Sequence, residues 1–69
     1  MLDEMLSEIG IAAGEVYRYL DDKGQATVSE LRRELPLGSG RVDQAIGWLA
    51  REEKITIDSQ SRSKIIALR

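Results

Sequence analysis

One segment constrains the fold of this chain more than any other: residues 27–57, TVSELRRELPLGSGRVDQAIGWLAREEKITI. Its first part predicts a short helix over residues 30–34, with Ser29 as the N-cap, because a serine side chain accepts hydrogen bonds from the free N–H groups of a first helical turn. Pro36 ends this helix, since the residue before a proline is pushed out of the α region. The segment therefore does not form one long helix and must change direction.

A longer helix follows this break. Gly38 or Ser39 is expected to cap it, and the helix is expected to run to about Glu53. Its apolar residues recur at roughly every third or fourth position, which is the spacing of one buried helical face. This face consists of Val42, Ala45, Ile46, Leu49 and Ala50.

Three short extended segments accompany the helices. Residues 26–28 are partly β-branched and suit an edge strand. Residues 54–58 alternate polar and apolar side chains, and residues 64–68 predict a second strand of the same kind. Residues 59–63, SQSRS, form a polar hairpin loop between them. Together the three strands predict a small antiparallel sheet with a C-terminal hairpin.

The N-terminal segment predicts the first helix. It begins at about Leu2 or Ser7 and ends at Lys23, because Gly24 is a C-terminal stop signal. Its buried face carries Ile9, Ala13, Val16 and Leu20. A helix, a strand, two helices and a β-hairpin, in this order, make up a winged helix–turn–helix domain. We therefore expect one α+β domain over residues 1–69.

The composition limits how such a small domain is stabilised. A chain of 69 residues buries only about 60% of its unfolded surface. It has no Cys and no His, so disulfides and the usual zinc sites are excluded, and no metal or cofactor is expected. Oligomerisation remains as a means of stabilising so small a domain, and this favours a homodimer. No run approaches the roughly 18 apolar residues of a membrane span, and the N-terminus is acidic where a signal peptide would be basic. We expect a cytoplasmic protein without a membrane partner.

The charge is unevenly distributed along the chain. Residues 1–30 contain seven acidic and two basic side chains, a net charge of −5, whereas residues 31–69 contain eight basic and five acidic ones, a net charge of +3. The half with the helix–turn–helix pattern is therefore mildly basic. The isoelectric point near 5.0 nevertheless lies well below the value of about 9 that is typical of nucleic-acid-binding domains.

One motif adds a family resemblance. The sequence AIGWLARE at residues 45–52 is its specific part, and residues 9–24, IGIAAGEVYRYLDDKG, and 27–31, TVSEL, extend it over nearly the whole chain. In these segments the chain resembles a small, uncharacterised winged helix–turn–helix family of bacteria and archaea, known as a domain of unknown function. The resemblance implies the fold; it supplies no established activity and no catalytic motif.

A winged helix–turn–helix domain most often binds double-stranded DNA, with the second helix of the motif in the major groove. Arginine and glutamine suit bidentate contacts with guanine and adenine, and basic side chains elsewhere contact phosphates. The candidate nucleic-acid-binding residues are Arg32, Arg33, Arg41, Gln44, Arg51, Arg62 and Lys64. The alternative is a solvated surface, because Asp43, Glu52 and Glu53 cancel the basic charges of the same helix.

Trp48 is the least expected residue of the long helix, because it lies about 100° from the centre of the buried face. It either packs inside the chain or anchors a partner, together with Tyr17 and Tyr19 of the first helix. A dimer centred on Trp48 would cover the face that DNA needs. Gly10 and Gly14 lie one turn apart on the first helix, and there, as at Gly47, close packing inside the domain is expected, with an isologous dimer through the first helix as the second possibility.

Nothing in the sequence supports catalysis. The serines lie in caps and loops without a basic partner, and no phosphate-binding loop follows a strand. We therefore expect no enzyme and no small-molecule substrate. The first hypothesis is a DNA-binding or transcription-associated regulator. The alternative is a protein-interaction or dimerisation module that uses the winged-helix scaffold without binding DNA.

Overall fold

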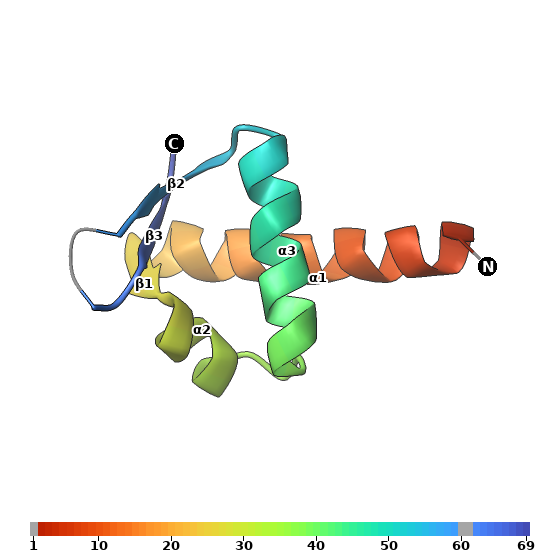
Figure 1. Cartoon of the computed structure of the whole chain (residues 1–69), viewed down its shortest axis with the longest axis horizontal. Helices are drawn as coiled ribbons and strands as arrows, with labels where there is room; N and C mark the ends of the chain where they lie inside the picture. Colours follow the sequence, from red (N-terminus) through yellow and green to blue (C-terminus); the bar gives the residue numbers. More distant parts are fainter. Residues whose placement is uncertain (1, 60–61) are drawn as a thin grey trace.

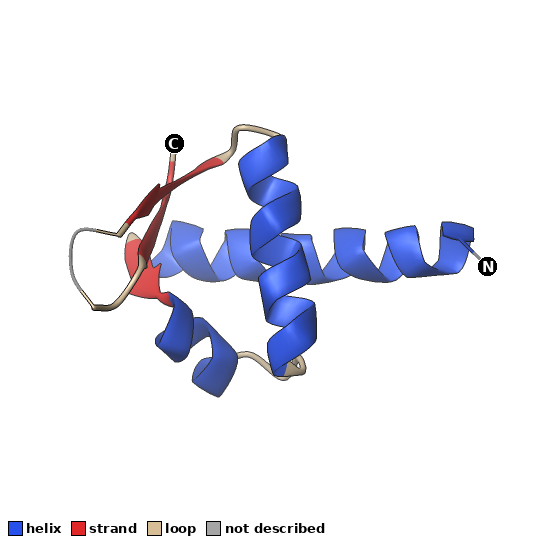
Figure 2. Ribbon diagram, in the orientation of Figure 1, coloured by secondary structure: helices blue, strands red, loops and turns tan. Residues whose placement is uncertain are grey.

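The computed structural model describes residues 2–59 and 62–69 and confirms the predicted winged helix–turn–helix fold (Figures 1 and 2). Its elements are α1 (Leu2–Lys23), β1 (Gln25–Thr27), α2 (Val28–Glu34), α3 (Ser39–Arg51), β2 (Ile55–Asp58) and β3 (Ile65–Leu68). Helix α3 crosses α1 near the middle of α1, and the small sheet lies beside the C-terminal half of α1 (Figure 1). None of the described helices is long and apolar enough to cross a bilayer.

Helix α1 is longer than its buried face requires. It starts at Leu2, the earlier of the two predicted starts, and ends at Lys23 as predicted. Gly24 follows with a φ of 90°, a left-handed conformation that glycine adopts without strain, and its N–H bonds the carbonyl oxygen of Leu20 at 2.7 Å. This turn brings the chain into β1.

The N-cap of α2 corrects one prediction. Thr27, and not Ser29, caps the helix, and its Oγ1 accepts the backbone N–H of Glu30 at 3.0 Å. The reason lies in the sheet: β1 pairs with β3 only as far as Thr27, and the chain turns helical at Val28. At the other end Leu35 is extended, with φ −92° and ψ 138°, as expected before Pro36.

Helix α3 begins after Gly38, which is one of the two predicted caps. As a glycine, Gly38 has no side chain that could accept a capping hydrogen bond. It ends at Arg51, two residues earlier than predicted. Glu53 then adopts a left-handed φ of 59°, and its N–H bonds the Ala50 carbonyl oxygen at 3.0 Å. The N–H of Lys54 bonds the Leu49 carbonyl oxygen at 2.9 Å, which completes a Schellman motif. The position that usually holds glycine in this motif is therefore held by a glutamate.

The sheet has the order β1-β3-β2. Both pairs are antiparallel, as predicted. Ala26 lies opposite Ile66, and Ile57 lies opposite Ile66 on the other side. The hairpin of β2 and β3 is the wing; residues 60 and 61 of its predicted loop lie outside the described residues.

The core lies where α1, α3 and the sheet meet. Its largest fully buried side chains come from α1, α2, α3 and β3: Leu20, Leu31, Ile66, Val16 and Val42. The predicted face of α3 is confirmed as buried, with Ala50 at its edge only partly covered. No charged or polar side chain is buried in the described part of the chain. The polar groups that bear on function therefore all lie at the surface.

Candidate nucleic-acid interface

Helix α3 presents three different flanks around its buried face. The flank directed at solvent carries Gly40, Gln44, Gly47 and Arg51, all exposed, at positions that follow one another along the helix. A Cβ atom at Gly40 or Gly47 would meet nothing within 4 Å. The glycines therefore leave open space on this flank, and Gln44 and Arg51 are the two of these four residues that have a polar side chain.

A second flank faces α1. Arg41 lies here and not at the solvent face: its Nη2 donates to Oε2 of Glu8 at 2.9 Å, and its side chain is 31% exposed. Nη1 of Arg41 is buried and has no hydrogen-bond partner among the residues that the structure describes. Trp48 lies two turns further along the same flank. It packs against the core, which agrees with the alternative that Trp48 packs inside its own chain. Arg41 and Trp48 are seven residues apart, which is about two helical turns, and this spacing predicts that they share a flank.

The third flank faces α2 and the wing, and it carries an ion pair between the two helices of the motif. Asp43 of α3 accepts hydrogen bonds from Arg32 of α2, from Nη2 to Oδ2 at 2.7 Å and to Oδ1 at 2.9 Å, and from Nε to Oδ1 at 3.2 Å. Both side chains are about half exposed. Asp43 therefore neutralises the charge of Arg32, which is a predicted phosphate contact, and places a negative charge on this flank of α3.

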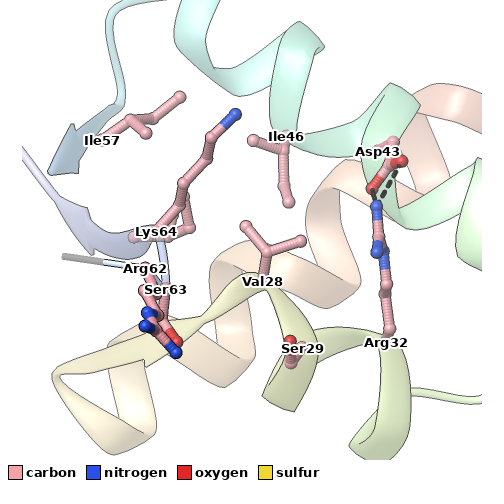
Figure 3. A pocket seen from close by; sticks show the side chains of 10 residues that line it. Val28, Ser29, Arg32, Asp43, Ile46, Ile57, Arg62, Ser63 and Lys64 are labelled. Atoms are coloured by element: carbon pink, nitrogen blue, oxygen red, sulfur yellow. Dashed lines mark hydrogen bonds and ion pairs between the residues drawn. The ribbon is translucent and has the colours of Figure 1, made fainter. Parts of the chain in front are cut away.

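A hollow of about 440 Å³ separates this flank from the wing (Figure 3). It is lined by Val28, Ser29, Arg32, Asp43, Ile46, Ile57, Arg62, Ser63, Lys64 and Ile66. Its lining includes four apolar side chains, among them Ile57, which is 46% exposed. In Figure 3 the Lys64 side chain points from the wing toward α3, and Arg62 lies across the hollow from Arg32. The structure thus brings together three of the predicted cations, on α2 and on the wing.

The apolar members of this hollow were not among the predicted site residues. The alternation of residues 54–58 predicts that Ile57 and Ile55 share a face, but Ile55 is buried and Ile57 is not. The difference depends on how far the wing stands from α3, which the sequence pattern does not encode.

The remaining predicted cations differ in their partners. Arg33 lies on α2 and pairs with the adjacent Glu34 at 3.3 Å. Within residues 2–59 and 62–69, no ion pair joins Arg51, Arg62 or Lys64. Positive charge without a carboxylate partner is therefore concentrated at the end of α3 and on the wing.

The predicted aromatic residues occupy three different environments. Tyr19 is half-buried, and its hydroxyl donates to Oε2 of Glu30 at 2.6 Å. This hydrogen bond, assisted by desolvation and by the negative charge of Glu30, raises the pKa of Tyr19 to about 12. Tyr17 is exposed, while Trp48 is partly buried. Only Tyr17 and Trp48 border a common surface, a second hollow between α1 and α3.

The glycines of α1 and α3 correct another prediction. Close packing inside the domain does not explain them: a Cβ atom at Gly10 or Gly47 would meet nothing within 4 Å, and one at Gly14 would meet only Nη1 of Arg18, at 3.8 Å. The expectation that Trp48 lies on the DNA-reading face is also wrong, because Trp48 borders α1 and leaves Gln44 and Arg51 exposed.

Comparison with known proteins agrees with this fold. A family model described as a winged helix-turn-helix domain (DUF2582) matches residues 1–68. An uncharacterised protein of Methanocaldococcus jannaschii, MJ1608, is 33% identical over 99% of this chain and 100% of its own length.

Two solved structures are similar as well. One comes from a study of the DNA recognition and protein interaction domains of HOP2; it has a TM-score of 0.72 and 28% identity, over 84% of this chain and 98% of that chain. The other is a crystal structure of an ArsR family transcriptional regulator, RHA00566, with a TM-score of 0.66 and 26% identity, over 97% of this chain and 73% of that chain.

Proposed function

The chain belongs to the winged helix-turn-helix domain family DUF2582, and from this premise we propose that it binds double-stranded DNA as a transcription-associated regulator. The observation that carries the proposal is the placement of Arg51, Arg62 and Lys64, which have no carboxylate partner among the described residues and lie on α3 and the wing. These are the two elements with which winged helices hold DNA. The similar ArsR family regulator supports the same function.

In the proposed complex α3 enters the major groove with its solvent flank. Gln44 reads a base edge, since its amide suits bidentate contacts with adenine. Gly40 and Gly47 allow the helix backbone to approach the groove closely, because no side chain stands between them and the bases. Arg41 contributes only after its ion pair with Glu8 opens.

The wing and the end of α3 supply the phosphate contacts in this proposal. Three contacts by Arg51, Arg62 and Lys64 correspond to a salt slope of about −2.7, so raising the salt from about 50 to 200 mM weakens binding about 40-fold for one bound domain. Arg62→Ala and Lys64→Ala are each expected to reduce the slope by about 0.9. A matched control is Arg18→Ala, which removes a cation that pairs with Glu15 on α1. An equal loss of affinity in the control would contradict the placement.

A second function has an observation in its favour. Arg32, Arg33 and Arg41 are each paired with a carboxylate, and the net charge is −2, which suits contact with a protein better than contact with a phosphate backbone. The similar HOP2 structure also concerns protein interaction domains. A protein-interaction module without DNA binding is therefore the alternative, and the DNA titration separates the two.

Three further properties belong to the same proposal. The domain acts by binding and not by catalysis. It works as a homodimer, because a domain of 69 residues gains stability from a partner surface. It resides in the cytoplasm.

A further inference from the structure

The core-facing stripe of α1 continues beyond the rest of the domain. The helix has 22 residues, about 33 Å at 1.5 Å per residue, and the molecule measures 38 Å along its longest axis but only 23 × 22 Å across. Figure 1 shows no other element beside the first turns of α1. Met5 and Leu6 lie there in register with the buried Ala12, Ala13 and Val16, yet they are 54% and 50% exposed. These two apolar side chains thus continue the core-facing stripe, but no other described element packs against them.

This stripe leads directly into the hollow between α1 and α3. The hollow measures about 300 Å³ and is lined by Gly10, Ala13, Gly14, Tyr17, Trp48, Leu49, Glu52 and Lys54. Leu6, Gly10 and Tyr17 follow one another along one side of α1. The space at Gly10 and Gly14 is open, since a Cβ atom would have no close neighbour there. One surface therefore carries both protruding apolar side chains and a depression of apolar character.

We propose that a second copy of this chain covers this surface, with the two α1 helices antiparallel and the Leu6 side chain of each copy seated in the hollow of the other. A surface that holds both the protrusion and its receptacle is self-complementary under a two-fold axis, which is the requirement for an isologous dimer. The Trp48 and Tyr17 side chains supply the aromatic walls that anchor such interfaces.

The position of the hollow along α1 selects the antiparallel arrangement. Leu6 precedes the residues of α1 that line the hollow, so a parallel pair would place Leu6 against Leu6, whereas an antiparallel pair places each Leu6 over the hollow of the partner. The opposed helix dipoles favour the same arrangement.

The dimer leaves the proposed DNA-binding surface free. Gln44, Gly47 and Arg51 lie on the solvent flank of α3, and the wing residues line the other hollow. A two-fold dimer would present both α3 helices to a palindromic site. This inference deepens the proposed homodimer and is independent of whether the domain binds DNA.

Sedimentation equilibrium of the full chain without DNA tests the proposal. At about 0.5 mM protein, wild type should have a mass of twice 7.7 kDa. Leu6→Lys should weaken the dimer about 100-fold or more, because each dimer loses two buried leucines. The matched control is Ile11→Lys, which replaces an equally apolar residue that is 67% exposed on the opposite side of α1 and should leave the dimer unchanged.

Gly10→Gln separates loss of the interface from loss of the fold. Glutamine favours the helix over glycine, so the monomer should become more stable, while the longer side chain fills the hollow and weakens the dimer at least about tenfold. A monomeric wild type at about 0.5 mM, or equal effects of Leu6→Lys and Ile11→Lys, would overturn the proposed surface. A dimer that fails to bind DNA would overturn only the proposed function.

Discussion

The ion pair between Arg32 and Asp43 gives the sharpest prediction, because its removal should lower stability and raise DNA affinity together. In Asp43→Asn the bidentate contact, with its shortest distance of 2.7 Å, is lost. Both partners are about half exposed, so the pair stabilises the fold by only about 0.2–1 kcal/mol. For a domain of this size, each kcal/mol corresponds to roughly 4–8 °C in Tm. The melting temperature of Asp43→Asn should therefore fall by a few degrees.

The same substitution releases Arg32 at the edge of the hollow that Arg62 and Lys64 also line. One more phosphate contact steepens the salt slope by about 0.9, so the ratio of affinities at about 50 and 200 mM salt should rise about 3.5-fold per bound copy. Fluorescence anisotropy with a labelled duplex at these two salt concentrations measures this ratio. The control is Glu15→Gln, which removes one negative charge and releases Arg18 on α1. An unchanged slope in Asp43→Asn, or an equal gain in the control, would refute the placement of DNA at this hollow.

Four other substitutions probe the fold. Gly47→Ala should raise the free energy of unfolding by about 1 kcal/mol, because the new Cβ has open space, and a lower Tm would contradict this reasoning. Glu53→Gly should raise the Tm by a few degrees, since it relieves a left-handed φ of 59°, whereas a decrease would show that the ion pair with Arg69 matters more. In Tyr17→Phe, an alkaline absorbance titration should place the pKa of Tyr19 at about 12, and a midpoint near 10 would contradict the hydrogen bond to a carboxylate. Because the folded state holds this proton more tightly, its stabilising contribution should be complete below pH 10 and disappear as the pH rises to about 12, which urea unfolding compared with Tyr19→Phe can measure.

The fold was predictable because its breakpoints have local causes. Gly24 ends α1, and Pro36 ends α2, through restrictions that act within two residues of each. The alternation of polar and apolar side chains in residues 54–58 likewise predicts a strand there. Such signals need no knowledge of the rest of the chain.

The errors arose where distant segments compete. Thr27 and Ser29 are both suitable caps, and the pairing of β1 with β3 decides between them. The position of Arg41 on α3 was predictable from periodicity, but its partner Glu8 lies 33 residues away in the sequence, so that contact was not. The low helix propensity of glycine predicts close packing at Gly10, but the open space beside Gly10 depends on how α3 crosses α1. Local periodicity thus predicts faces, and only the packing of helices reveals which face remains open.

Salt-dependent binding of duplex DNA tests the proposed function most directly. With a pool of random-sequence duplexes, wild type should bind at about 50 mM salt and lose about 40-fold or more in affinity at 200 mM, and Arg62→Ala and Lys64→Ala should each flatten the slope. Absence of binding at about 50 mM salt, or binding with a slope near zero, would contradict the proposal and favour a protein-interaction module on the same fold.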